Sequence, residues 1–321
     1  MAIRIKARFF ERALCDEVQL AEDARAKLSS FPEVPLSADQ VLQLGKTHTA
    51  DLAARTFYES LLISEHGKFI NQLSSYSASR VEQPAQIKLY VLPGMFYREH
   101  PEMGGDGSLV KKIGGKFGFD AEIIQTESTG SVSTNSAIIA EKLSAETHSN
   151  IWLISISKGA SDLRHYLQNH EVNNNIRGCI NVAGIPKGVP FIDHKLSSPF
   201  KRLLYRVLCF IVKIDYQSMH EMQTRHDFWK NKHWRQELEM IHMLPVPHSA
   251  HLHNSLREKY HLTLEKGPND GFIPLTDVLD LPGKIVPLWG CDHFLRTHRM
   301  SGYLYQLFNY ISDQYNQQRT K

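Results

Sequence analysis

IWLISISKG, residues 151–159, joins a run of apolar residues to a serine placed between small residues. The run Ile151–Ile154 is short and wholly apolar, which is typical of a buried strand. A sharp turn from a strand into a helix holds the corner residue in a strained conformation, and the residues two before and two after it must be small. Ser155 and Gly159 meet that requirement. The pattern predicts a strand-to-helix corner that presents Ser157 as a nucleophile.

A serine nucleophile needs a base and a group that orients the base. After a corner of this kind they follow in the order Ser, Asp or Glu, His. Two downstream segments supply them in that order: residues 267–274 contain Asp270, and residues 289–294 contain His293. Both segments are rich in turn residues and follow expected strands. Chain order therefore supports a catalytic interpretation of the serine corner.

These residues resemble the α/β-hydrolase superfamily over about residues 85–315. The acid of that family commonly lies in an Asp-Gly-x-x-Pro loop, as at residues 270–274. Its histidine commonly follows the last strand in a Gly-x-x-His segment, as at residues 290–293. Ser155 departs from the family pattern, because a glycine usually stands at that position.

The resemblance implies a role for each of three residues. Ser157 is the expected nucleophile, His293 the general base and then acid, and Asp270 the group that holds the imidazole tautomer. Asp270 is preferred over three other acids in the same region, of which one adjoins His293 in sequence and two lie beyond the acid loop: Asp292, Asp277 and Asp280.

Acyl transfer passes through an oxyanion, which preorganised N–H donors must stabilise. By the same resemblance, the first donor is the backbone N–H of Lys158. The second comes from the loop after the first strand, where Met95 is the expected donor and Phe96 the near alternative. We expect the side chains of the same loop, Phe96, Tyr97 and Arg98, to contact the substrate.

Two further motifs carry less weight. Residues 155–158 also match S-x-x-K, which marks penicillin-binding folds, but the accompanying S-D-N and K-T-G motifs do not occur. Residues 248–253 hold three histidines with no Cys or carboxylate to complete a metal site. In a chain with 17 histidines such a cluster arises by chance. We expect no metal and no cofactor.

The chain divides by pattern into three parts. Residues 1–85 predict a mostly helical appendage, with Ser37 as a helix N-cap. From residue 86, short apolar runs alternate with helical segments, which predicts an α/β class with a mainly parallel sheet flanked by helices. Residues 86–185 and 258–321 form the expected α/β-hydrolase core, and residues 186–257 a helical cap or lid insertion. Strands are expected at 87–92, 121–124, 151–156, 178–183, 260–264 and 284–288, and helices at 107–117, 133–146, 159–169 and 298–315.

The expected cap carries the strongest local charge. Residues 199–235 hold eight Lys or Arg against three Asp or Glu, mixed with aromatic residues. Such a cap favours a lipophilic acyl group or a phosphate-bearing acyl carrier as substrate. Residues 199–213 alternate basic with apolar side chains. Packing in the core is the favoured reading of this segment, with peripheral membrane contact as the alternative.

Composition narrows the class of protein. The 321 residues are 42% apolar, enough for one large domain or a domain with an appendage. The net charge of +3 and the absence of a basic, aromatic face argue against nucleic acid. The N-terminus lacks the apolar core of a signal peptide, and the apolar stretch 207–212 is too short to span a bilayer. We expect a cytoplasmic protein, since the four cysteines are far apart and form no C-x-x-C pair: Cys15, Cys179, Cys209 and Cys291.

The sequence therefore predicts a serine hydrolase that cleaves an ester or thioester through an acyl-enzyme on Ser157. Its substrate is expected to be a small-molecule or carrier-bound acyl compound. Two alternatives stay open. One is an acyltransferase that uses the same three residues but excludes water, and the other is a non-catalytic binding protein with residues 1–85 as its docking surface.

Overall fold

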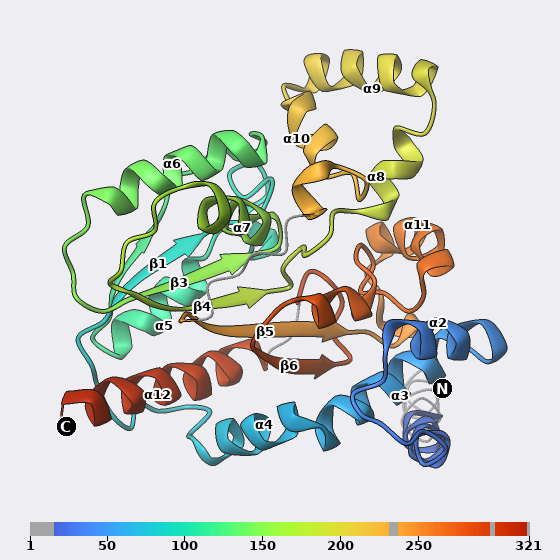
Figure 1. Cartoon of the computed structure of the whole chain (residues 1–321), viewed down its shortest axis with the longest axis horizontal. Coiled ribbons are helices and arrows are strands. Elements are labelled where there is room, and N and C mark those ends of the chain that lie inside the picture. The colour runs from blue at the N-terminus through green and yellow to red at the C-terminus, as the bar shows by residue number, and fades with distance from the viewer. Residues whose placement is uncertain (1–15, 231–236, 296–298, 320–321) are drawn as a thin grey trace, which may run out of the picture.

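The computed structural model describes residues 16–230, 237–295 and 299–319 (Figure 1). Predictions for residues 1–15, Cys15 among them, and for residues 231–236 and 298 lie outside the described residues. Six strands form one parallel sheet in the order β2-β1-β3-β4-β5-β6. The predicted α/β class is confirmed. The strands are β1 (Lys88–Leu92), β2 (Asp120–Ile123), β3 (Ile151–Ile156), β4 (Ile176–Val182), β5 (Glu239–Val246) and β6 (Lys284–Trp289).

Helices cover both faces of the sheet (Figure 1). Successive residues of a strand point to opposite faces. In β3, Trp152 and Ile154 pack toward a layer formed by α4 (Glu65–Ser75), α5 (Ser108–Lys116) and α12 (Met300–Arg319). Ile151 and Leu153 pack toward α6 (Val132–Ser144) and α7 (Lys158–Asn169). Burial on both faces explains why the strands are continuous apolar runs rather than alternating ones.

The N-terminal region is mostly helical. A helix covers residues 16–28 and is followed by α2 (Ala38–Thr47) and α3 (Ala50–Ile63). Ser37 caps α2 in a reciprocal capping box, as predicted. Phe57 and Leu61 of α3 share a buried cluster with Val246 of β5 and Ile285 of β6. These helices therefore share a hydrophobic core with the edge of the sheet.

One predicted strand is wrong. Residues 260–264 end helix α11 (Asn254–Thr263) and enter the short 3-10 helix η4 (Leu264–Lys266). The buried residues of α11 are Leu256, Tyr260 and Thr263, a spacing of four and three that fits a helix. The fifth strand is β5, which lies inside the range 186–257 that the sequence assigned to the cap. The helical excursion therefore ends before β5, and part of that range is sheet.

Three helices form this excursion between β4 and β5: α8 (Pro190–Lys195), α9 (Pro199–Val212) and α10 (Tyr216–Glu221). A 3-10 helix, η2 (Asp227–Lys230), follows them. α9 lies farthest from the sheet (Figure 1). Glu221 anchors the excursion, because its carboxylate accepts hydrogen bonds from the backbone N–H groups of Val132 and Ser133 in the first turn of α6. The remaining 3-10 helices are η1 (Pro101–Met103), η3 (Ser249–His251) and η5 (Leu275–Asp280).

Candidate active site

The predicted strand-to-helix corner is present. Ser157 lies between the end of β3 and the start of α7 with φ 50° and ψ −117°. A positive φ at a residue with a side chain costs on the order of 1–3 kcal/mol and persists only where the surroundings enforce it. Gly159 is part of that enforcement. A Cβ atom there would lie 2.5 Å from the carbonyl oxygen of Leu92 and 2.7 Å from that of Pro93, so only glycine lets α7 approach the end of β1.

The three predicted residues meet at the carboxyl end of the sheet. Ser157 Oγ lies 2.8 Å from Nε2 of His293, and Nδ1 of His293 lies 2.8 Å from Oδ2 of Asp270. His293 and Asp270 are 7% and 3% exposed, whereas Ser157 is half-buried. Ser157 is therefore partly accessible to solvent, whereas His293 and Asp270 are shielded from it.

The acid loop holds Asp270 in one orientation. Its Oδ1 accepts hydrogen bonds from the N–H groups of Phe272, at 2.9 Å, and Ile273, at 2.8 Å. Gly271, between Asp270 and Phe272, has φ 108°, a conformation that favours glycine. The backbone N–H of His293 donates to the carbonyl oxygen of Asp270 at 2.9 Å, which joins the acid and histidine segments directly. The Phe272 ring lies beside the imidazole, with centroids 4.8 Å apart.

The predicted oxyanion donors, the N–H groups of Lys158 and Met95, belong to the start of α7 and to the loop after β1. Lys158 is the first residue of α7, where an N–H has no partner within the helix. The loop after β1 passes close to the corner, because a Cβ atom on Gly94 would lie 3.5 Å from Cβ of Ser157. The N–H of Phe96 donates to the carbonyl oxygen of Ser128 at 3.1 Å. That bond commits Phe96 elsewhere and favours Met95 as the second donor.

The polar groups of Tyr97 and Arg98, two predicted substrate contacts, bind the neighbouring backbone. The Tyr97 hydroxyl and the Arg98 guanidinium both donate to the carbonyl oxygen of Thr126, at 2.8 Å each. Arg98 Nε also donates to the Tyr97 oxygen at 2.9 Å. These bonds fix the loop after Met95 to the backbone of Thr126. Phe96 is half-buried with φ 64°, and its contact with the substrate stays a prediction.

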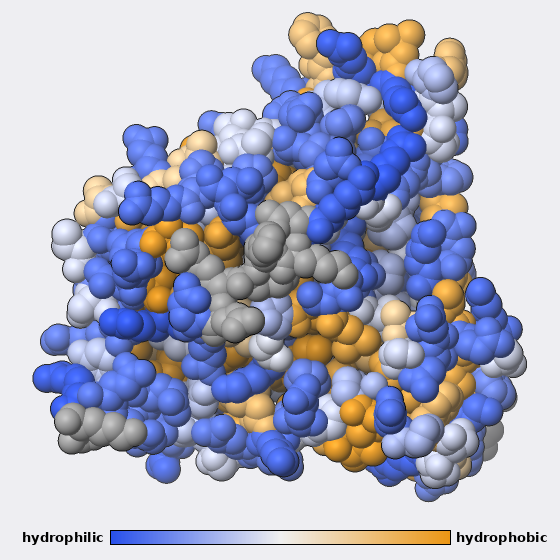
Figure 2. Space-filling view, in the orientation of Figure 1, coloured by the Kyte–Doolittle hydropathy of each residue, from blue (hydrophilic) through white to orange (hydrophobic). Residues whose placement is uncertain are grey.

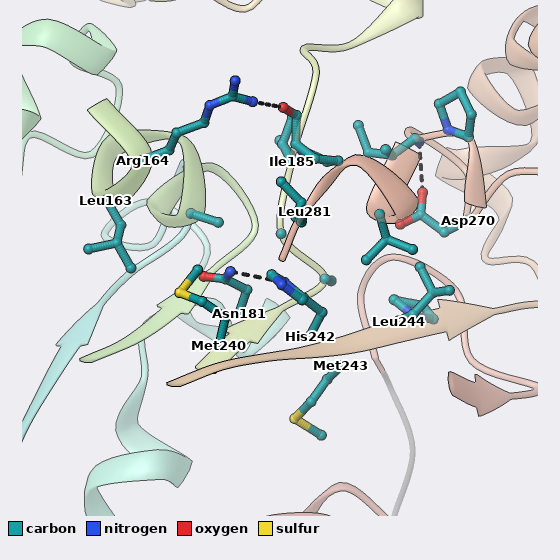
Figure 3. Close-up of a pocket in the computed structure, with 18 of the residues that line it drawn as sticks. Leu163, Arg164, Asn181, Ile185, Met240, His242, Met243, Leu244, Asp270 and Leu281 are labelled. Carbon is teal, nitrogen blue, oxygen red and sulfur yellow. Dashed lines mark hydrogen bonds between the residues drawn. The ribbon is translucent and has the colours of Figure 1, made fainter. Parts of the chain in front are cut away.

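Ser155, the departure from the family pattern, belongs to a buried polar chain that the sequence did not reveal. Its Oγ donates to Oδ1 of Asn181 at 2.5 Å. Nδ2 of Asn181 in turn donates to Nδ1 of His242 at 3.1 Å (Figure 3). Nε2 of His242 then donates to the carbonyl oxygen of Pro282 at 2.9 Å. Burial lowers the pKa of His242 to about 4, so the ring is neutral at pH 7. These hydrogen bonds link β3, β4 and β5 at the position two residues before Ser157.

A largely apolar pocket lies beside this chain (Figure 3). Its volume is about 610 Å³, counting the space open to solvent. Asp270 lines it, but Ser157 and His293 do not. The pocket therefore lies behind the acid and not at the serine hydroxyl, and we do not assign the scissile group of a substrate to it. Other residues that line it include Leu163, Met240, His242 and Leu281.

A buried ion pair joins Lys158, the residue after Ser157, to Asp162. Nζ of Lys158 lies 2.7 Å from Oδ1 of Asp162, one turn along α7, and both side chains are almost fully buried. Asn135 of α6 donates to the other carboxylate oxygen at 2.9 Å. Burial raises the pKa of Asp162, and the Lys158 ammonium opposes that shift. This side chain of Lys158 points into the core, so its contribution to the corner comes from the backbone N–H.

The weaker sequence motifs have structural roles. S-x-x-K would require Ser155 to begin a helix. Ser155 instead lies within β3, where its hydroxyl donates to Asn181. The side chains of His248 and His253 cap η3 and α11 by accepting from the N–H groups of Ala250 and Ser255. Within the described ranges, no group of three or more His, Cys, Asp or Glu is placed to hold a metal ion. Nor does any helix described here combine the length and apolar character needed to cross a membrane.

The fold is shared with known enzymes. No protein-family model matches the sequence, and no curated protein matches it either. Among solved structures, the metagenomic carboxyl esterase MGS0156 is similar with a TM-score of 0.59 and 15% sequence identity, over 73% of this chain and 78% of that one. The mature form of the lipase BlEst2 from Bacillus licheniformis is similar with a TM-score of 0.51 and 16% identity, over 74% and 97%. At such identities the likeness bears on the fold alone. The chain therefore has an α/β-hydrolase fold.

Proposed function

We propose that the protein is a serine hydrolase that cleaves an ester or thioester through an acyl-enzyme on Ser157. The observation that carries the proposal is the unbroken line of hydrogen bonds from Ser157 Oγ through His293 to Asp270, with the serine at a strained corner. A nucleophile, a base and a group that orients the base are the parts that acyl transfer requires.

In the first half of the reaction, Ser157 Oγ attacks the substrate carbonyl carbon while Nε2 of His293 takes the hydroxyl proton. The carbonyl oxygen becomes an oxyanion between the N–H groups of Lys158 and Met95. Asp270 stabilises the imidazolium that forms. When the tetrahedral intermediate collapses, the bond to the leaving oxygen or sulfur breaks, and His293 protonates the departing alcohol or thiol.

Water completes the reaction. His293, neutral again, takes a proton from a water molecule whose oxygen attacks the acyl carbon of the ester on Ser157. The second tetrahedral intermediate uses the same two N–H groups. Its collapse releases a carboxylic acid and returns the proton from His293 to Ser157 Oγ. The site therefore ends the cycle as it began, with no cofactor in any step.

The similar structures and the helical excursion support two substrate classes. The two similar solved structures are described as a carboxyl esterase and a lipase, which supports an oxygen ester as the first class to test. The helical excursion after β4 is rich in apolar and basic side chains, which suits a lipophilic acyl group on a phosphate-bearing carrier or head group.

A fluorophosphonate probe tests the proposal directly, because it forms a covalent bond only with an activated serine. We expect the wild-type chain to be labelled, with the adduct mapped by mass spectrometry to Ser157, and the Ser157→Ala variant to stay unlabelled. Ser155→Ala is the matched control, since it removes a serine hydroxyl two residues away and should still be labelled. A wild-type chain that resists the probe, or a Ser157→Ala variant that reacts equally, contradicts the proposal.

Labelling alone does not identify the acceptor of the acyl group. A panel of p-nitrophenyl esters of rising chain length measures which acyl group the site prefers. Repeating the reaction with added alcohols or amines separates a hydrolase from an acyltransferase. The proposal predicts a free carboxylic acid as the main product in each case, and a dominant new ester or amide would assign the chain to acyl transfer.

A further inference from the structure

The helix α9 exposes its apolar side chains to solvent. Phe200, Leu203, Val207, Phe210 and Ile211 are 76%, 62%, 49%, 85% and 65% exposed, and Cys209 is the one residue of the helix that is buried. Apolar residues of a surface helix normally face the core. Core packing, the favoured reading of residues 199–213 from the sequence, is therefore wrong for this helix.

The apolar face points away from the body of the protein. Successive residues of a helix are about 100° apart, which gathers the exposed apolar residues on one side and leaves Cys209 on the other. On the inner side, Cys209 Sγ lies 3.5 Å from the Met219 sulfur, and Arg202 donates to the carbonyl oxygen of Leu196 at 3.0 Å. Figure 2 shows orange atoms gathered at the outer end of the molecule, where Figure 1 places α9.

The segment that contains this face is basic. From His194 to Lys213 the chain contains five Lys or Arg and no Asp or Glu. On the helix, Lys201 and Arg206 lie at the margins of the apolar face, Arg202 lies on the inner side, and Lys213 follows the last turn. A second copy of this chain laid against the same face would bring like charges together. An anionic lipid surface instead offers an apolar interior for the exposed face and negative head groups for its rim.

We propose that α9 is an interfacial helix that places its apolar face in the boundary region of an anionic lipid bilayer. The basic residues then contact lipid phosphates, and α8 and α10 connect the membrane-bound helix to the body that carries the serine corner. The inference does not depend on the proposed hydrolase activity, because it stands on the exposure and charge of α9 alone.

Co-sedimentation of the full chain with lipid vesicles tests the inference. We expect binding to vesicles of phosphatidylcholine mixed with phosphatidylglycerol, weaker binding to phosphatidylcholine alone, and loss of the difference at high salt. The double variant Leu203→Ser/Phe210→Ser should weaken binding at least about tenfold, since each apolar side chain contributes transfer free energy. Val18→Ser/Ile63→Ser, at residues 61% and 65% exposed elsewhere, is the matched control and should bind as the wild type does.

A second pair of variants tests the charge. Lys201→Gln/Arg206→Gln should weaken binding to the anionic vesicles by about fivefold for each charge removed, whereas Lys111→Gln/Lys112→Gln on α5 should not. Ser157→Ala should bind vesicles normally, so a failure of the catalytic proposal is distinguishable from a failure of this one. Wild-type chain that ignores anionic vesicles, or Leu203→Ser/Phe210→Ser chain that binds them equally, overturns the inference. The inference is also overturned if the wild-type chain forms a dimer in analytical ultracentrifugation, binds no vesicles, and becomes a monomer with Leu203→Ser/Phe210→Ser.

Discussion

One carboxylate oxygen of Asp270 lies 2.8 Å from Nδ1 of His293, and the other accepts hydrogen bonds from two backbone N–H groups, those of Phe272 and Ile273. Because a carboxylate only accepts, Nδ1 must carry the imidazole proton in this arrangement. Nε2 is then left to accept from Ser157. The acid loop therefore sets which nitrogen of His293 carries the proton and which one faces the serine.

Asp270→Asn should remove that control. The two loop N–H groups hold the amide oxygen, which turns the amide NH₂ toward Nδ1 and moves the ring proton to Nε2. The imidazole then no longer accepts a proton from Ser157, and we expect kcat to fall by about 10³-fold to 10⁴-fold with little change in KM. Steady-state kinetics on a p-nitrophenyl ester measure the loss. Asp277→Asn is the matched control, and a larger loss there than at Asp270 would move the acid to Asp277.

Gly159→Ala should damage the corner without touching the three polar residues. The new Cβ would meet two backbone carbonyl oxygens at 2.5 and 2.7 Å, and neither atom belongs to a flexible side chain. α7 must move away from β1, which shifts Ser157 and the Lys158 N–H together. We expect a loss of about 2–4 kcal/mol in the free energy of unfolding and at least about 10²-fold in kcat/KM. Urea denaturation and ester hydrolysis measure the two effects.

Gly115→Ala on α5 is the control for this substitution. A Cβ atom there has no neighbour within 4 Å, so the helix gains alanine's higher propensity at no steric cost. We expect a stabilisation of about 0.5–1 kcal/mol and unchanged hydrolysis. If both variants lost stability equally, the close approach at Gly159 would not be the cause.

The sequence revealed the corner and its partners because their chemistry is local. Ser157 sits in a five-residue pattern, and Asp270 and His293 each lie in a short segment rich in turn residues, so chain order was enough to expect that they meet. Ser155 was different. Its partners Asn181 and His242 come from β4 and β5, and only strand pairing brings them beside it.

The sequence misplaced the fifth strand for a physical reason. The apolar run Met240–Leu244 is interrupted by His242 and followed by Pro245, both of which weaken a strand pattern. In the structure, His242 is satisfied by Asn181 and Pro282, and Pro245 lies near the end of the strand. The exposure of α9 was also beyond the sequence. The same apolar spacing suits a helix in the core and a helix on a surface.

The Lys158–Asp162 pair should behave as a unit. Replacing Lys158 with Met leaves the Asp162 carboxylate buried with Asn135 as its remaining side-chain donor, and Asp162→Asn leaves a buried ammonium. We expect each single variant to lose about 3–5 kcal/mol of stability. Lys158→Met/Asp162→Asn removes both charges and should lose clearly less than the sum of the two. Urea denaturation of all four proteins gives the coupling, and additive losses would show that the charges do not depend on each other.

Asp277 should make stability depend on pH. Burial raises its pKa to about 6, Lys187 opposes the shift, and Asp280 and Asp270 add to it. Because this pKa is above the unfolded value, the folded chain binds the extra proton between about pH 4 and pH 6, and the charged carboxyl costs stability above pH 6. Asp277→Asn stays neutral throughout. It should therefore be more stable than wild type by about 1–3 kcal/mol at pH 8 and indistinguishable near pH 4.

Urea denaturation at both pH values measures this difference in stability. Asp23→Asn, at an exposed residue, is the control and should change stability by less than about 0.5 kcal/mol at either pH. An advantage of Asp277→Asn that is larger at pH 4 than at pH 8 would contradict the raised pKa.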